Sequence, residues 1–137
     1  MPRLFLDTNI VVRFVEGTAE TRDRLQRRLA GVRAGTDAVV TSELVRFECL
    51  VGPRRSGARA VEMLYERFFS AGENDVRPLD RAVFDLAVGI RAEHRFSTPD
   101  ALHLATAIVA GCDIFLTADR TLARFPRLPV EVLFSET

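Results

Sequence analysis

Residues 98–119 read TPDALHLATAIVAGCDIFLTAD, and this stretch decides the fold class. Its first half is apolar almost all round and predicts a buried helix from Pro99 to Ala110, with Thr98 as the N-cap. Its second half holds the apolar run Ile114 to Thr117, which predicts a buried strand, and Gly111 separates the two. A buried strand next to a buried helix is typical of a parallel sheet with helices on both faces.

The remainder of the chain repeats this alternation of short apolar strands and helices. Further strands are expected at residues 4–6, 38–41, 76–79 and 130–133, and helices at 10–15, 19–34, 43–51, 58–69 and 81–94. Residues suited to cap or end these helices are Thr18, Ser42, Asp80, Gly35, Gly52 and Gly72. The pattern predicts an α/β protein built on a parallel sheet.

Length and composition favour one globular domain over residues 1–137, because no linker-like segment interrupts the chain. The formal net charge is zero, so no global field draws the protein to nucleic acid, although all 19 basic residues are arginine. Cys49 and Cys112 are isolated and are interpreted as core residues of a reducing compartment. The first apolar run is short and ends at Asp7, so we expect no signal peptide, no membrane span and a cytoplasmic protein.

Four acidic residues stand where an ordinary globular chain has apolar or neutral ones. Asp7 ends the run of residues 4–6, Asp119 follows the run ending at Thr117, Glu48 interrupts an apolar helix face, and Asp100 opens an almost uncharged helix. Each acid alone could serve as a helix cap, favour a helix dipole or reach solvent. Gathered in one cluster, the four acids would repel by about 4 kcal/mol per close pair. The cluster therefore indicates a site for a hard divalent cation.

The helix expected at residues 43–51 contains two glutamates with different surroundings. Glu43 falls at the first helical position and can face water, whereas Glu48 shares the apolar side with Leu44 and Val51. Glu48 is thus the better ligand candidate, and we expect Glu48→Gln to leave the metal-free protein as stable or more stable. His103 lies one turn after Asp100 and could orient a ligand, touch a phosphate, or simply be a hydrogen-bonded core residue.

These residues, in this order, resemble the PIN-domain family, and within it the VapC-type toxins of bacterial toxin–antitoxin pairs. The segments that carry the resemblance are Leu6-Asp7-Thr8-Asn9, Glu48-Cys49-Leu50-Val51-Gly52, Thr98-Pro99-Asp100-Ala101-Leu102-His103-Leu104-Ala105 and Gly111-Cys112-Asp113-Ile114-Phe115-Leu116-Thr117-Ala118-Asp119. The likeness extends from the first expected strand to the last. Any one of these motifs is weak alone, whereas four in order within one short chain form a specific signal.

The resemblance implies a three-layer fold with a five-stranded parallel sheet in the order 3-2-1-4-5 and a metal-dependent ribonuclease site at its carboxyl edge. It implies that Asp7, Glu48, Asp100 and Asp119 are the catalytic and metal-binding acids, with Mg²⁺ or Mn²⁺ as the cofactor. Asn9 and Thr117 would lend polar support, and His103 could join them. The family also implies a homodimer held inactive by a small antitoxin whose tail occupies the acidic groove. Ala118 departs from the family, since many relatives carry Asn or another polar residue there.

The implied chemistry agrees with the residue types. A bound Mg²⁺ or Mn²⁺ can activate water for attack on a phosphodiester, and arginines near the groove can hold the RNA backbone. Single-stranded regions of tRNA, rRNA or mRNA are the expected substrate, because the scissile phosphate has to reach the groove. A phosphotransferase of the haloacid-dehalogenase type is a rival reading, but it needs a second Asp where this chain has Asn9. A non-catalytic RNA-binding or scaffold version of the PIN-like fold is the other alternative, and its mark would be a lost acid.

Overall fold

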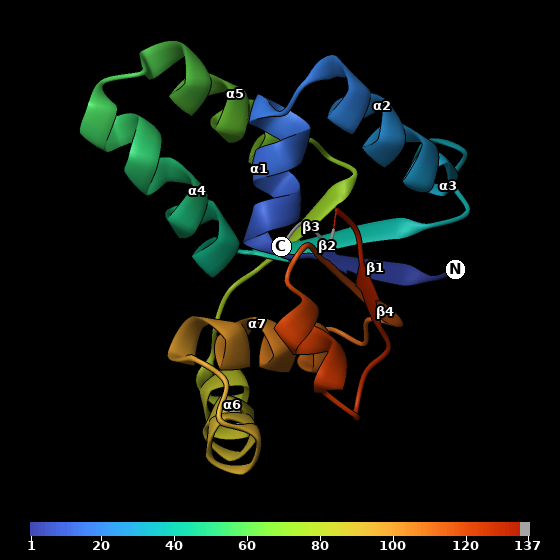
Figure 1. Cartoon of the computed structure of the whole chain (residues 1–137), viewed down its shortest axis with the longest axis vertical. Helices are drawn as coiled ribbons and strands as arrows, with labels where there is room; N and C mark the ends of the chain where they lie inside the picture. Colours follow the sequence, from blue (N-terminus) through green and yellow to red (C-terminus); the bar gives the residue numbers. More distant parts are fainter. Residues whose placement is uncertain (135–137) are drawn as a thin grey trace.

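The structure is a computed structural model that describes residues 1–134. Its strands and helices alternate along the chain, as Figure 1 shows. The strands are β1 (Arg3–Leu6), β2 (Ala38–Ser42), β3 (Asn74–Arg77), β4 (Ile114–Thr117) and β5 (Val130–Val132). The helices are α1 (Thr8–Glu16), α2 (Ala19–Arg28), α3 (Ala30–Arg33), α4 (Glu43–Ser56), α5 (Arg59–Ser70), α6 (Arg81–His94), α7 (Thr98–Val109) and the 3₁₀ helix η1 (Arg120–Arg124).

All five strands form one sheet in the order β3-β2-β1-β4-β5, and every neighbouring pair is parallel. This confirms the expected strand order. Parallel strands place their carboxyl ends at the same edge of the sheet, so the residues that follow β1, β2 and β4 are brought together there. The central strand β1 lies between β2 and β4, with Phe5 beside Val40 on one side and Phe115 on the other.

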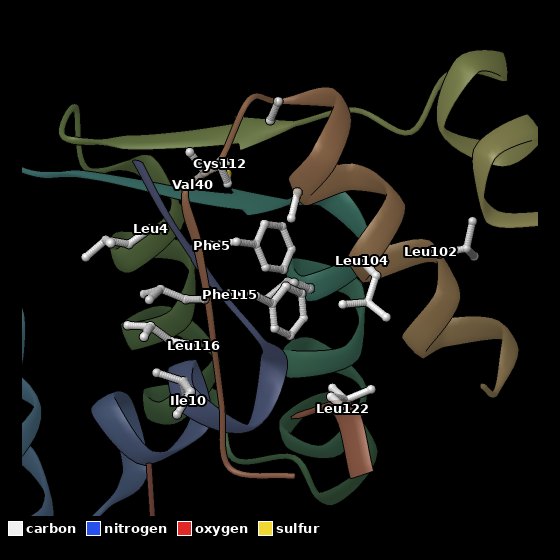
Figure 2. Close-up of a cluster of buried hydrophobic side chains, with 14 of the residues drawn as sticks. Leu4, Phe5, Ile10, Val40, Leu102, Leu104, Cys112, Phe115, Leu116 and Leu122 are labelled. Carbon is white, nitrogen blue, oxygen red and sulfur yellow. The ribbon is translucent and has the colours of Figure 1, made fainter. Parts of the chain in front are cut away.

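Helices cover both faces of the sheet and complete the three layers (Figure 1). Helices α1 to α5 lie on one side, and α6 and α7 pack together on the other. The core fills both interfaces because residues of one strand alternate between the faces. Figure 2 shows the rings of Phe5 and Phe115 stacked beside Leu104 of α7, with Leu4 and Leu116 directed to the opposite face; the two ring centroids are 5.0 Å apart.

Helix α4 differs most from the sequence-based expectation, which ended it at Val51. The helix continues through Gly52 and Pro53 to Ser56, and Gly57 ends it with a left-handed backbone, at φ 73°. Pro53 has no N–H to donate inside the helix, yet its ring is buried against neighbouring elements. Packing of α4 against α5 thus outweighs two local signals that favour a helix end.

Three smaller expectations were also wrong. Strand β3 covers residues 74–77 rather than 76–79, because pairing with β2 sets its position and tolerates polar residues in this edge strand. Ser97, not Thr98, caps α7 by accepting a hydrogen bond from the N–H of Asp100. The expected helix 19–34 is broken at Leu29 into α2 and α3.

Across residues 1–134, no helix has both the length and the apolar character that a membrane crossing requires.

Candidate active site

A cavity of about 410 Å³ lies at the carboxyl edge of the sheet and is lined by all four of the acids singled out from the sequence. Each comes from a different part of the chain: Asp7 follows β1, Glu48 lies in α4, Asp100 lies in the first turn of α7 and Asp119 follows β4. The other lining residues are Thr8, Asn9, Val12, Arg13 and His103. The parallel sheet therefore gathers acids that lie up to 112 residues apart in the chain, from Asp7 to Asp119.

Asp7 is the most enclosed of the acids, with 4% of its surface exposed. Its Oδ1 accepts a hydrogen bond from the N–H of Thr8 at 2.8 Å and thereby caps α1. Its Oδ2 accepts from the Thr117 hydroxyl at 2.7 Å and from Asn9 Nδ2 at 3.3 Å. The capping role that the sequence allowed is thus present, and the same carboxylate also forms part of the cavity wall.

Asn9 links the ends of β1 and β4. Its Nδ2 donates to both Asp7 and Thr117, while its Oδ1 accepts from the backbone N–H of Ala118 at 2.9 Å. The bond at Ala118 uses the backbone, so the apolar side chain at this position leaves it intact. Asn9 and Thr117, which the resemblance gives as polar support, therefore both donate hydrogen bonds to Asp7.

Asp100 and Asp119 form the more open side of the cavity and are both half-buried. Asp100 is in the first turn of α7, where the positive end of the helix dipole favours a carboxylate. Asp119 caps η1, with its Oδ1 accepting from the N–H and the hydroxyl of Thr121 at 2.9 and 2.8 Å. These capping contacts fix Asp119 and do not remove it from the cavity wall.

Glu48 is held by two donors from two other helices. The Thr8 hydroxyl of α1 donates to Glu48 Oε1 at 2.5 Å, and His103 Nε2 of α7 lies 2.7 Å from the same oxygen. Because that oxygen belongs to a carboxylate, Nε2 is the protonated nitrogen and donates. His103 is buried, and its Nδ1 has no hydrogen-bond partner among residues 1–134. No hydrogen bond within these residues uses Glu48 Oε2, which is left available to a ligand.

The helix register separates the two glutamates of α4 as expected. The Glu48 side chain is 28% exposed, whereas the Glu43 side chain is 57% exposed and approaches Arg46 at 3.8 Å. Ser42 caps the helix, accepting from the N–H of Val45 at 3.1 Å, and this fixes Glu43 at the first helical position. Glu43 therefore lies outside the cavity and Glu48 within its wall.

Burial and mutual repulsion set the electrostatics of the cavity. Burial raises the pKa of Asp7 above its ordinary value, and the opposing effects of His103 and Thr117 do not cancel it. Burial likewise raises the pKa of Asp100, with the nearby carboxylates of Asp7 and Asp119 adding to the rise. Burial alone would raise the pKa of Glu48, but the hydrogen bonds from His103 and Thr8 outweigh it and lower that pKa.

The donors suit a hard divalent cation in kind, since four carboxylates line one cavity and two of them are costly to ionise. A cation would lower that cost by compensating their charge. Among residues 1–134, no group of three or more His, Cys, Asp or Glu side chains is arranged so that it could hold a metal ion. The acids thus fit Mg²⁺ or Mn²⁺ by their chemistry and are not assembled into a ready cage.

Two polar residues of the cavity wall were not singled out from the sequence. Thr8 was placed before the expected helix start at Ile10, whereas it is the first residue of α1 and contacts Glu48. Arg13 follows Asn9 by one helical turn, and its Nη1 donates to the Asn9 carbonyl oxygen at 3.1 Å. The spacing of four residues between Asn9 and Arg13 was the available signal, since such residues share a helix face.

Comparison with known proteins identifies the family. Residues 4–128 match the PIN domain, so this chain belongs to the PIN domain family. A comparison with curated proteins gives no match.

Solved structures share the fold at low sequence identity. The chain is similar to VapBC2 from Rickettsia felis bound to a promoter DNA fragment, with a TM-score of 0.77, 18% identity, and coverage of 95% of this chain and 98% of that one. It is also similar to a toxin–antitoxin complex from Klebsiella pneumoniae, with a TM-score of 0.72, 22% identity and coverage of 94% and 96%. VapC20 from Mycobacterium tuberculosis, a sarcin-ricin loop cleaving toxin, gives a TM-score of 0.66, 18% identity and coverage of 82% and 86%.

Proposed function

We propose that this protein is a Mg²⁺- or Mn²⁺-dependent endoribonuclease, the toxin of a VapBC-type toxin–antitoxin pair, that cleaves single-stranded regions of RNA. The observation that carries the proposal is the convergence of four acids from four parts of the chain on one cavity. Membership of the PIN domain family supports it, as does a fold shared with VapBC complexes and with a sarcin-ricin loop cleaving toxin. All four acids are present, which argues against a non-catalytic version of the fold.

In this proposal Asp7, Glu48, Asp100 and Asp119 are the residues that hold the ion. When bound, the ion supplies an activated water for phosphodiester hydrolysis and neutralises charge on the phosphate. The chain contributes orientation: Thr117 holds Asp7 through Oδ2, and two donors hold Glu48 through Oε1. Such outer hydrogen bonds fix the direction of acidic ligands and favour their ionised form. No Ser, Cys or His nucleophile is required.

The proposed antitoxin has a second cavity available to it, away from the acids. This cavity of about 750 Å³ lies between α1, α2, α3 and α5, and it has apolar walls that include Phe14, Leu64 and Phe68. Arginines outnumber acids among the lining residues, which include Arg22, Arg33 and Arg67 but a single acid, Glu73. An apolar antitoxin segment flanked by acidic residues would match this surface, while basic residues of the antitoxin would reach the acid cavity.

The partner proposal is tested by purifying the native protein from its own cells. We expect a small co-encoded protein to accompany it. Leu64→Arg should release that protein, while the isolated chain with this substitution cleaves RNA as well as the isolated unsubstituted chain. The proposed homodimer is tested by analytical ultracentrifugation of the purified chain. Recovery of the chain alone from its cells would contradict the antitoxin proposal.

The function itself is tested by incubating purified protein with tRNA and rRNA in Mn²⁺ or in EDTA and mapping the cleaved ends. We expect discrete cuts within single-stranded regions in Mn²⁺, none in EDTA, and none with Asp100→Asn. Cleavage that persists in EDTA would contradict the metal requirement. RNA binding without cleavage in any divalent ion would instead establish the non-catalytic alternative.

A further inference from the structure

Arg13 is the one arginine in the wall of the acid cavity within residues 1–134. It lies in the second turn of α1, and it shares the cavity wall with Asp7 and Asn9 of the same segment. The other basic side chain of the wall, His103, is already bound to Glu48. Arg13 is thus the arginine that shares this wall with the four acids.

The guanidinium of Arg13 is anchored but not neutralised. Its Nη1 donates to the Asn9 carbonyl oxygen at 3.1 Å, and its central carbon lies 5.8 Å from the centre of the Phe134 ring. No carboxylate within residues 1–134 forms an ion pair with it. The bond to Asn9 uses one of about five N–H donors, so the remainder of the planar fork is left for a ligand.

Other arginines of this protein behave differently when glutamates are near. Three of them form ion pairs in which two guanidinium nitrogens reach one carboxylate: Arg28 with Glu131, Arg46 with Glu66 and Arg54 with Glu62. Arg13 lies in a wall with four acids and pairs with none of them. The Arg13 side chain is directed along α1 toward the Asn9 carbonyl oxygen, so its positive charge is not neutralised by a carboxylate within residues 1–134.

A purely structural role for Arg13 on Phe134 is the alternative explanation. Arg24 already covers that ring, with its guanidinium carbon 4.6 Å from the ring centre compared with 5.8 Å for Arg13. A cation 5.8 Å from a ring is close to the limit of about 6 Å for this interaction. The aromatic contact therefore accounts for Arg24 better than for Arg13.

We propose that Arg13 binds a backbone phosphate of the RNA beside the acid cavity. This inference rests on the proposed ribonuclease function. Four carboxylates repel an approaching phosphodiester, whereas a guanidinium in the same wall gives that anion a fixed point of attachment. The flat fork can donate two parallel hydrogen bonds to phosphate oxygens. A phosphate contact carries no base information, so Arg13 sets the position of the RNA chain and not its sequence.

The test measures binding separately from cleavage, with fluorescent oligo(U) and oligo(A) in Mg²⁺ over a series of KCl concentrations. Glu48→Gln serves as the parent protein because its slow cleavage consumes little substrate during the binding measurement. We expect Arg13→Gln in this parent to weaken binding about tenfold, equally for both oligonucleotides. The slope of log affinity against log salt should fall by about 0.7, the value for one lost contact to a single strand.

Arg127→Gln is the matched control because it removes the same charge elsewhere. Arg127 is exposed and precedes β5, so it lies toward the edge of the sheet opposite the acids. We expect Arg127→Gln to leave affinity and slope unchanged. Equal effects of the two variants, or no effect of Arg13→Gln, would overturn the proposal. Loss of a bound partner protein with unchanged RNA affinity would also overturn it and assign Arg13 to a protein interface.

Arg13→Lys keeps the test decisive if Arg13→Gln folds poorly. The ammonium retains the charge and loses the fork, so affinity should fall severalfold while the salt slope stays that of the parent. Parental affinity for Arg13→Lys would overturn the role of the fork. RNA cleavage by the unsubstituted protein is measured separately. Cleavage together with RNA binding that does not depend on Arg13 would contradict this inference and leave the ribonuclease function standing. RNA binding that depends on Arg13, without cleavage, would contradict the ribonuclease function and leave this inference standing.

Discussion

Glu48→Gln is predicted to lower RNA cleavage about a hundredfold and slightly destabilise the metal-free protein, whereas Glu43→Gln should do neither. Glutamine retains the shape of Glu48 and an Oε1 that can accept from Thr8 and His103, which now bond at 2.5 and 2.7 Å. It loses the negative charge and replaces Oε2 with an amide. The two bonds therefore become ordinary neutral ones, and the proposed ion loses an anionic ligand.

The magnitude follows from those two bonds. A hydrogen bond to a charged group is worth about 1 kcal/mol more than a neutral one, so the two together would cost about 2 kcal/mol. Relief of repulsion toward Asp7, whose pKa Glu48 helps to raise, returns part of this and leaves a net loss of about 1 kcal/mol. The melting temperature in EDTA should fall by about 4 °C. The sequence alone led us to expect no loss of stability, and the hydrogen bonds from Thr8 and His103 reverse that expectation.

Single-turnover cleavage in Mn²⁺ and thermal unfolding in EDTA measure the two effects. Loss of a ligand worth about 3 kcal/mol in the transition state lowers cleavage about a hundredfold. Glu43→Gln makes the same chemical change at a side chain that is 57% exposed, so its cleavage rate and melting temperature should match those of the unsubstituted protein. An inactive Glu43→Gln variant together with full cleavage by Glu48→Gln would contradict both the register of α4 and the site built on it.

Three further predictions concern the same cavity. Burial raises the pKa of Asp7 in the folded protein, so the stabilising contribution of its protonated form is complete below about pH 4 and is lost as the pH rises through the folded pKa. Asp7→Asn should therefore abolish cleavage and yet make the metal-free protein more stable at pH 7 in urea unfolding. A loss of stability above about 1 kcal/mol would make Asp7 a structural residue. Mn²⁺ at a hundred times its dissociation constant should stabilise the fold by about 2.7 kcal/mol, and melting curves that coincide in EDTA and Mn²⁺ would contradict this. His103→Gln, whose amide can still donate to Glu48, should retain more cleavage than His103→Ala at equal unfolded fraction, and equal activities would show that the bond between His103 and Glu48 does not orient the acid.

The sequence predicts those parts of the fold that depend on local chemistry. Thr18, Ser42 and Asp80 were expected to cap helices, and each accepts the hydrogen bond of an N-cap. The expected end of α4 at Gly52 was wrong. The sequence does not distinguish a glycine that ends a helix in the αL conformation from one inside a helix, whereas the packing of α4 on α5 does. The polar start of β3 at Asn74 was missed because an edge strand takes its register from its neighbour.

The candidate site was predictable where an acid follows an apolar strand, as at Asp7 and Asp119. The contacts of Thr8 and His103 with Glu48 join three helices, α1, α4 and α7. These helices are far apart in the chain, so the spacing of the residues in the sequence does not predict the contacts. Arg13 lay hidden among 19 arginines, and within residues 1–134 its place in the wall of the acid cavity sets it apart. Residues that act by touching another element therefore escape a reading of local patterns.

The central claim is that the cavity between Asp7, Glu48, Asp100 and Asp119 holds a divalent ion. The most direct measurement is anomalous diffraction at the manganese absorption edge from crystals of the protein grown with Mn²⁺. We predict an anomalous peak inside this cavity, within about 2.5 Å of carboxylate oxygens from at least two of the four acids, and no such peak in Asp7→Asn crystals. A fully occupied manganese peak elsewhere, with this cavity empty of metal, would contradict the account.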